Sequence, residues 1–423
     1  MKNILEKTLK IFAILTVKRY RPKIIGITGS VGKTSAKDAV FVVLAKKFNA
    51  RKTEKSFNNE IGFPLTILGE KSYGKNIFAW ILVFLKSFLK LIYTRYPDVL
   101  VLEYGVDKQK DMQYLLSIVK PDVAVVTAIG ELPTHIENFN NKKELIKEKT
   151  ELLKYLKNED MAILNIDDDT VFDMRNKTKA KVISFGFSKD ADFKIFEPEK
   201  REDMFDGSKI PLGISFKIEY KGVVIPVRLD GIYGRQSAYA AGIACLVGSI
   251  FGINLVEASE ALKEFKNPPG RLNLIEGIND TFILDDTYNA SLLSMEAGLQ
   301  VLKDLEAERK VAVLGSMLEL GEFSEKAHKK VGEIASSFCD VIITVGKEAE
   351  NIYKEAEKRG FKKKYHFNSA DELVEKIEGI IQSGDLIFIK GSQAVRLEKA
   401  VKKIMAHPEN AKKLLVRQEK SWK

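Results

Sequence analysis

Residues 23–35, which read KIIGITGSVGKTS, predict the fold of the first part of the chain. The run from Lys23 to Thr28 is apolar enough for a buried strand, and a helical pattern follows from about Ser35 to Phe48. Backbone N–H groups and a helix dipole at such a junction can hold phosphate oxygens. The loop between strand and helix consists of Thr28, Gly29, Ser30, Val31, Gly32, Lys33 and Thr34. We interpret it as a variant nucleotide-binding loop, because position 27 is Ile where the commonest pattern has glycine.

In a loop of this kind, Lys33 holds the β and γ phosphates and the Thr34 hydroxyl binds Mg²⁺. Apolar runs alternate with helical patterns beyond it, which favours a mostly parallel sheet covered by helices. The strand candidates are 99–103, 123–127 and 162–165, and a helix is expected over 142–156. Within residues 182–230 the apolar period becomes two around a Lys221-Gly222 turn, so we expect a β-hairpin insert there.

A breaker, Asn267-Pro268-Pro269-Gly270, separates this segment from a second alternation of strands and helices, and we place a hinge there. The second segment is typical of a Rossmann-like α/β domain. Its expected strands are 281–284, 311–314, 341–345 and 386–389, and its expected helices lie near 294–304, 324–337, 347–359, 370–382 and 396–405. The predicted organisation is therefore α/β: an N-terminal amphipathic helix (1–22), an ATP-binding P-loop central domain (23–269) and a C-terminal domain (270–423), whose end, 407–423, is a basic helix or a ragged tail.

Composition narrows the class of protein. The chain has 423 residues, a formal net charge of +10 and two cysteines, Cys245 and Cys339, so we expect two or three domains in a reducing, cytoplasmic setting. The lysines are mixed with glutamates along helical segments and accompany no nucleic-acid-binding motif, so we expect no nucleic acid partner.

Two apolar stretches, 4–17 and 77–93, carry lysines and are too interrupted to span a bilayer. Two interpretations stay open. The helices pack on the protein, or residues 1–20 and 77–93 form a peripheral contact with the inner membrane surface, with lysines reaching lipid headgroups.

Three further side chains are candidates for the site. Glu103 ends an apolar strand, where ligands collect at the carboxyl edge of a parallel sheet, and a carboxylate there suits Mg²⁺. His135 lies in the loop after the strand at 123–127, and Lys149 lies in a charged helix. Taken alone, a loop histidine and a helical lysine are usually solvated residues.

The order of motifs resembles the Mur ligase family from about Lys23 to Ile404. The matching stretches are TGSVGKTS, FNNEIGFPLTIL, VLEYG, EKTELL, ILNIDDD, PPGRLNLIE, DDTYNASLLSM, VLGSMLELGE and IKGS. DDTYNA and LGSMLELGE most resemble the D-alanyl-D-alanine-adding branch. The resemblance implies an ADP-forming, ATP-dependent ligase in which a carboxylate attacks the γ phosphate and an amine displaces phosphate from the acyl phosphate, with a peptidoglycan-type precursor and an amino acid or dipeptide as small-molecule substrates.

The resemblance also implies roles for single residues. Lys33 and Thr34 match the ATP loop, Glu103 matches the ligand of a first Mg²⁺, and His135 matches a ligand of a second. Lys149 matches a lysine that is carbamoylated in many members and then supports the second metal. Arg271 matches an arginine that reaches ATP, Asp286 an acidic residue near the nucleotide, and Tyr288 and Asn289 would border the same cleft.

The sequence departs from the family pattern at four places. Ala240 replaces the asparagine associated with adenine contact, Ser291-Leu292 replaces Asn-Pro, and Gln393 replaces an arginine. About twenty residues precede the first strand, where UDP-using members carry a domain that holds the uridine nucleotide. A lipid-linked or other non-UDP carboxylate is therefore an alternative substrate, and a P-loop ATPase or nucleotide-sensing module is the alternative of another class.

Overall fold

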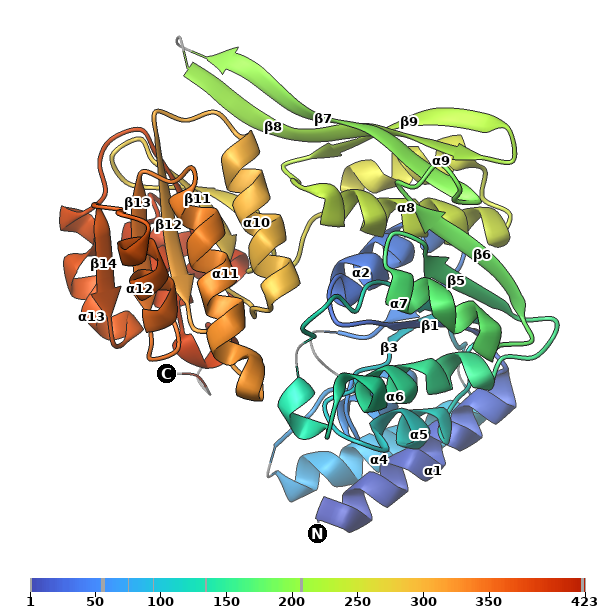
Figure 1. Cartoon of the computed structure of the whole chain (residues 1–423). Coiled ribbons are helices and arrows are strands. Elements are labelled where there is room, and N and C mark those ends of the chain that lie inside the picture. The colour runs from blue at the N-terminus through green and yellow to red at the C-terminus, as the bar shows by residue number, and fades with distance from the viewer. Residues whose placement is uncertain are drawn as a thin grey trace.

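The computed structural model describes residues 2–54, 58–74, 76–93, 95–133, 135–205, 208–419 and 422. Within them the strands form a nine-stranded sheet and a six-stranded sheet. Each sheet is covered by helices, and the two units lie side by side with the antiparallel end of the first sheet extending above both (Figure 1). The predicted α/β class with mostly parallel strands is confirmed.

The first sheet has the strand order β2-β3-β1-β4-β5-β6-β7-β8-β9. Its parallel part contains β1 (Lys23–Thr28), β2 (Ala50–Lys52), β3 (Val99–Glu103), β4 (Val123–Val126), β5 (Met161–Asn165) and β6 (Lys181–Gly186). β1 lies between β3 and β4, with Ile27 opposite Glu103 in the register. The carboxyl ends of these three strands therefore meet beside the nucleotide-binding loop.

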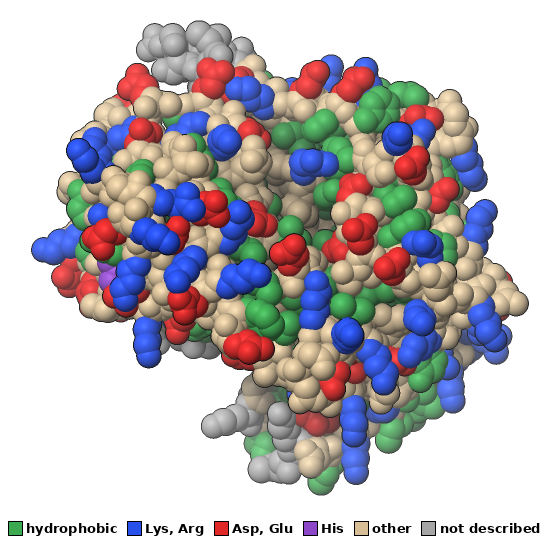
Figure 2. Space-filling model, in the orientation of Figure 1, with side chains coloured by type: hydrophobic (Ala, Val, Ile, Leu, Met, Phe, Trp, Pro, Cys, Tyr) green, Lys and Arg blue, Asp and Glu red, His purple; other side chains and the backbone are tan. Residues whose placement is uncertain are grey.

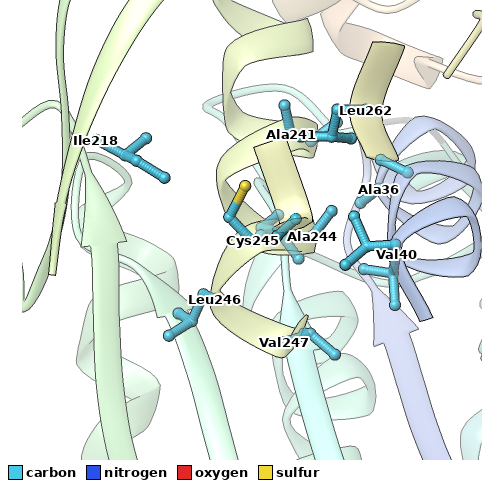
Figure 3. Close-up of a cluster of buried hydrophobic side chains, with 14 of the residues drawn as sticks. Ala36, Val40, Ile218, Ala241, Ala244, Cys245, Leu246, Val247 and Leu262 are labelled. Atoms are coloured by element: carbon cyan, nitrogen blue, oxygen red, sulfur yellow. The ribbon is translucent and has the colours of Figure 1, made fainter. Parts of the chain in front are cut away.

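Two helical layers cover this sheet. One face packs against α2 (Lys33–Leu44), α8 (Arg235–Ile250) and α9 (Leu255–Ala261), and alanines such as Ala241 and Ala244 let α8 approach α2 closely (Figure 3). The other face is covered by α1 (Lys2–Tyr20), α3 (Gly62–Leu68), α5 (Asp111–Leu116), α6 (Lys142–Lys154) and α7 (Asp169–Phe172). α4 (Ile77–Tyr93) packs outside this layer, against α1 and α3. None of the described helices is both long enough and apolar enough to cross a bilayer.

The expected β-hairpin insert is larger than a hairpin. β7 (Phe193–Phe205), β8 (Ser208–Tyr220) and β9 (Val223–Asp230) form an antiparallel meander that continues the first sheet beyond β6. β7 was not predicted, because its sequence FKIFEPEKREDMF is dominated by charged residues in its second half. The turn at Lys221-Gly222 lies where the sequence predicts it, between β8 and β9.

The second sheet has the order β10-β11-β15-β12-β13-β14, with β10 antiparallel to its neighbour. Its strands are β10 (Asn273–Glu276), β11 (Phe282–Asp286), β12 (Arg309–Gly315), β13 (Val341–Val345), β14 (Lys364–Phe367) and β15 (Asp385–Lys390). One face packs against α10 (Leu292–Asp304), α11 (Ser324–Ser336) and α12 (Glu350–Lys358), and the other against α13 (Ala370–Lys376) and α14 (Glu398–Ile404).

Where a basic helix or a ragged end was expected over 407–423, the described residues contain a short basic helix, α15 (Ala411–Leu414), with Lys412 and Lys413. After α15, Leu415 joins the core under α14, and the Arg417 guanidinium donates to the carbonyl oxygen of Tyr288 at 3.2 Å and pairs with Glu398 at 2.9 Å. Arg417 is 9% exposed, and its hydrogen bond to the Tyr288 carbonyl oxygen fixes the loop after β11.

Candidate active site

A cleft of about 280 Å³ lies where the carboxyl ends of strands from both sheets face each other. From the first sheet it receives the loops after β1, β2, β3 and β4, and from the second the loops after β11 and β15. The described lining residues are Ser30, Val31, Lys33, Thr34, Asn58, Asn59, Glu103, Gly105, Val106, Asp107, His135, Arg271, Tyr288, Asn289, Ala290, Ser291, Ser294 and Gln393. A site built this way is complete only when both units contribute to it.

The nucleotide-binding loop is held against the end of β4. The Ser30 amide donates to the carbonyl oxygen of Ala128 at 2.6 Å, and a Cβ on Gly29 would lie 2.1 Å from Thr127 Oγ1. Gly29 and Gly32 have φ values of 144° and 86°, which favour glycine. The Ser30 hydroxyl is buried and has no hydrogen-bond partner among the described residues. The loop thus presents an unsatisfied polar group to the cleft.

Lys33 and Thr34 begin α2 and point toward the neighbouring strand ends. Lys33 Nζ donates to the carbonyl oxygens of Gly29 and Ser30 at 3.0 and 3.3 Å. Thr34 Oγ1 lies 3.1 Å from Glu103 Oε2. Burial lowers the pKa of Lys33, and the Glu103 carboxylate partly offsets that effect. The structure therefore brings together the two loop residues and the strand-end carboxylate that the sequence singled out.

Glu103 is 4% exposed and is held on three sides. Its backbone N–H donates to Thr53 Oγ1 at 3.1 Å. Its Oε2 faces Thr34 Oγ1, and its Oε1 accepts from Asn58 Nδ2 at 3.4 Å. A buried carboxylate needs a cation or hydrogen-bond donors as partners, so Glu103, held between two polar side chains, can bind a cation.

Lys149 is buried rather than solvated. It is 2% exposed on α6, and its Nζ donates to the carbonyl oxygen of Gly29 at 3.0 Å. Burial, together with the nearby positive charge of Lys33, lowers the pKa of Lys149 to about 7. A large fraction of this amine is therefore neutral near neutral pH, which is unusual for lysine.

His135 connects the two units. Its Nδ1 lies 2.5 Å from Glu319 Oε2, in the loop after β12, and its Nε2 lies 3.3 Å from Asp107 Oδ1, in the loop after β3. The backbone of His135 is left-handed, with φ of 65°. The contact with His135 lowers the pKa of Glu319. The loop histidine is thus held between two carboxylates.

Arg271 enters the cleft from the start of the second unit. Its guanidinium lies over the Tyr288 ring, 4.0 Å from the centroid, and its Nε is buried without a hydrogen-bond partner in the described part of the chain. Gly270 before it has φ of 68°, and a Cβ there would lie 2.9 Å from the Tyr288 amide nitrogen. Only glycine allows the chain to pass this close to the loop that carries Tyr288 and Asn289.

Two predicted residues lie behind the cleft. Thr28 is fully buried and donates from Oγ1 to the carbonyl oxygen of Tyr104 at 2.9 Å. Asp286 pairs with Lys390 at 2.6 Å; burial raises the pKa of Asp286, and Lys390 partly offsets that effect. Neither of these side chains is among the lining residues, and the predicted residue Lys149 is not among them either. Contact between Asp286 and a nucleotide stays a prediction.

Sequence reasoning missed four residues: Asn58, Asn59 and Asp107, which line the cleft, and Glu319, which contacts His135. Three of them belong to stretches that carry the family resemblance, FNNEIG and LGSMLELGE. Nothing in those stretches says which residue reaches the cleft. Among the described residues no group of three or more His, Cys, Asp and Glu side chains could hold a metal ion by itself.

Comparisons with known proteins agree with this geometry. A family model described as Mur ligase middle domain matches residues 83–245, and one described as Mur ligase, glutamate ligase domain matches residues 270–393. The UDP-N-acetylmuramoyl-tripeptide--D-alanyl-D-alanine ligase of Bacillus subtilis (strain 168) is 30% identical over 389 residues, which cover 91% of this chain and 76% of that protein. The ligase of the same name from Escherichia coli (strain K12) is 27% identical over 386 residues, covering 90% and 76%.

Solved structures share the fold. MurF from Acinetobacter baumannii has a TM-score of 0.77 at 24% identity and covers 93% of this chain and 79% of its own. The MurF ligase from Thermotoga maritima in complex with ADP has a TM-score of 0.75 at 25% identity, with 94% and 83% covered. On the extent of these matches, the chain belongs to the Mur ligase family.

Proposed function

We propose that this chain is an ATP-dependent ligase that joins the carboxylate of a UDP-muramoyl tripeptide to D-alanyl-D-alanine. Relatives named for that reaction match 91% and 90% of the chain. The observation that carries the proposal is the cleft itself, in which the nucleotide-binding loop and Glu103 of one unit face Arg271 of the other. A reaction between a nucleotide, a carboxylate and an amine needs such a meeting point.

ATP binding rests on Ser30, Lys33 and Arg271. The Ser30 hydroxyl and the Arg271 Nε are buried at the cleft without partners, and phosphate oxygens would satisfy both. Lys33 would exchange its carbonyl partners for the β and γ phosphates, which gives it a stronger, charge-assisted hydrogen bond. The base would lie near Tyr239 and Ala240, in a small pocket between the loop and α8.

Thr34 and Glu103 would hold Mg²⁺. Two adjacent ligands of an octahedral Mg²⁺ lie about 2.9 Å apart, since each bond is about 2.05 Å long. The 3.1 Å between Thr34 Oγ1 and Glu103 Oε2 fits that spacing. When bound, Mg²⁺ would neutralise phosphate charge.

Lys149 and His135 would serve a second Mg²⁺. The neutral amine of Lys149 can attack CO₂, forming a C–N bond and releasing a proton, and the resulting carbamate offers anionic oxygens that suit Mg²⁺. His135 would have to exchange its contact with Asp107 or Glu319 for the metal. Binding of the second Mg²⁺ would then compete with the contact between His135 and Glu319, which joins the two units.

The reaction would proceed in two displacements. A carboxylate oxygen of the tripeptide attacks the γ phosphorus, the bond to the β phosphate breaks, and ADP leaves. The amine nitrogen of the dipeptide then attacks the carbonyl carbon, phosphate leaves, and the nitrogen loses a proton. Arg271, which lines the cleft, would stabilise the transferred phosphoryl group, and the second unit would exclude water from the acyl phosphate.

We place the functional parts at residues 1–22, 23–269 and 270–423. The first sheet and its helices end before Asn267, and the second begins with β10 at Asn273, which supports the second boundary. α1 packs against α3 and α4, so residues 1–22 would act together with the central part. A peripheral membrane contact of residues 1–20 and 77–93 is a separate proposal, because those helices contribute nothing to the cleft.

The test is formation of product, ADP and phosphate from ATP and Mg²⁺, followed by mass spectrometry. UDP-N-acetylmuramoyl-tripeptide and D-alanyl-D-alanine are supplied together and singly, beside a lipid-linked carboxylate and single amino acids. Product that requires both named substrates supports the proposal. Product only from the lipid-linked carboxylate would move the activity to another substrate, and phosphate release without any acceptor would favour an ATPase. Lys33→Met should abolish turnover, whereas Lys46→Met, at an exposed lysine away from the cleft, should leave it unchanged.

A further inference from the structure

We propose that the outer face of α1 and α4 is a docking surface for an anionic phospholipid bilayer. Eleven of the nineteen exposed large hydrophobic side chains in the described part of the chain lie on these two helices. Phe78 is 81% exposed, and Ile4, Ile11, Ile81, Leu85 and Phe88 are between 53% and 71% exposed. Apolar surface of this kind is uncommon on a monomeric protein unless it meets a partner or a membrane.

The two helices form one surface on the body of the protein. Trp80 and Val83 of α4 and Leu9 of α1 are buried against α3, and the Phe12 and Phe84 rings stack at 5.9 Å. The exposed positions Phe78, Ile81, Leu85 and Phe88 recur every three or four residues, so they share the face of α4 opposite Trp80 and Val83. α4 is thus apolar on both its inner and its outer face.

Basic side chains surround this apolar face. Lys7, Lys18 and Arg19 of α1 and Lys86 of α4 are exposed, and α4 contains no acidic residue. In the described part of the chain Lys7, Lys18 and Lys86 form no ion pair. Hydrophobic and basic side chains lie side by side at the lower edge of the molecule in Figure 2, the region of α1 and α4 in Figure 1.

The positive charge of this surface favours an anionic bilayer over a second copy of the chain. Lysines beside apolar side chains match a bilayer, where the apolar groups enter the headgroup boundary and the ammonium groups meet anionic lipid. A second copy of the chain would bring the same lysines against each other, which opposes self-association. α4 has 17 residues and is about 26 Å long, shorter than the hydrocarbon core, so it would lie along the surface.

The test is co-sedimentation of the full chain with phosphatidylglycerol vesicles and with phosphatidylcholine vesicles. We expect binding to the anionic vesicles that weakens as salt rises. Removing one positive charge should lower the partition coefficient about fivefold, so Lys18→Gln with Lys86→Gln should lower it about 25-fold. The matched control is Lys358→Gln with Lys402→Gln, two exposed lysines of the second unit with the same change in net charge.

The apolar contribution is tested with Phe78→Ser and Leu85→Ser, which replace exposed side chains and should preserve thermal unfolding and ligase activity. Loss of vesicle binding in this variant is expected. Wild-type protein that stays in the supernatant with anionic vesicles at low salt would overturn the proposal, as would an equal loss in the control pair. A concentration-dependent dimer abolished by the serine variant, without vesicle binding, would assign the face to a second copy instead.

Discussion

Replacing Lys149 by methionine should stabilise the protein by an amount that shrinks as the pH rises. The folded chain holds the amine with a pKa of about 7, whereas the ordinary value is 10.5. The unfolded chain therefore binds more protons than the folded chain between these two values, and folding stability rises with pH across that window. The cost of burying Lys149 is complete below about pH 7 and disappears above about pH 10.5.

The expected magnitude follows from the two pKa values. A fall from 10.5 to about 7 corresponds to a penalty of about 5 kcal/mol at pH 6 and about 2 kcal/mol at pH 9. Methionine removes that penalty and also the hydrogen bond to Gly29, which contributes about 1 kcal/mol. The variant should therefore be more stable by about 4 kcal/mol at pH 6 and by about 1 kcal/mol at pH 9.

Urea unfolding at several pH values between 6 and 9, in buffer freed of CO₂, measures this difference. Lys147→Met is the matched control, because Lys147 is an exposed lysine of the same helix and its replacement makes the same change in net charge. A stability difference for Lys149→Met that is constant over this range, or a wild-type protein that is the more stable one at pH 6, would refute the reasoning. The variant should also lose ligase activity, which separates the stability cost of Lys149 from its role.

Three further outcomes follow from the cleft. Glu103→Ala should abolish turnover with the fold preserved, as checked by phosphate release and circular dichroism, and near wild-type activity would contradict the assignment. Glu319→Gln should weaken the contact with His135 that joins the two units. The units should then separate, and the radius of gyration measured by small-angle X-ray scattering without ligands should rise. An unchanged scattering profile would show that Glu319 does not hold the units together. Arg417→Leu should lower the free energy of unfolding by about 1.5–3 kcal/mol, because the buried Glu398 loses one charge-assisted hydrogen bond and keeps its pair with Arg396. Urea unfolding of this variant at neutral pH measures the change, and a loss below about 1 kcal/mol would contradict the reasoning.

Local patterns predicted most of the elements. The strand over 99–103 and the helix over 77–93 coincide with β3 and α4, because an uninterrupted apolar run and an apolar stretch with lysines at helical spacing are both strong signals. β7 and β14 (Lys364–Phe367) were missed, because charged or half-exposed strands lack the apolar period. The helix expected over 370–382 ends as α13 at Lys376 and continues as a short 3-10 turn.

The site was predictable only where one sheet positions it. Lys33, Thr34 and Glu103 follow from a phosphate loop and a strand end, and the adjacency of β1 and β3 brings them together. The pair of His135 and Glu319 depends on how the two units meet, which no local pattern encodes. The burial of Lys149 depends on the packing of α6 against β1, and its charged sequence surroundings hide it.

In the proposed reaction, the two unsatisfied groups at the cleft link phosphate binding to the approach of the two units. Ser30 Oγ belongs to the first unit and Arg271 Nε to the second, and both are buried without partners in the described chain. A buried polar group left unpaired costs about 1–3 kcal/mol, so the free protein is less stable than it could be at the place where phosphate is expected. A phosphate that bonds to both groups recovers this energy only with the two units close together, and its departure as product removes the reason for staying closed. In this proposal the binding energy of ATP drives closure, and Gly270 lies directly before the arginine that links the two events.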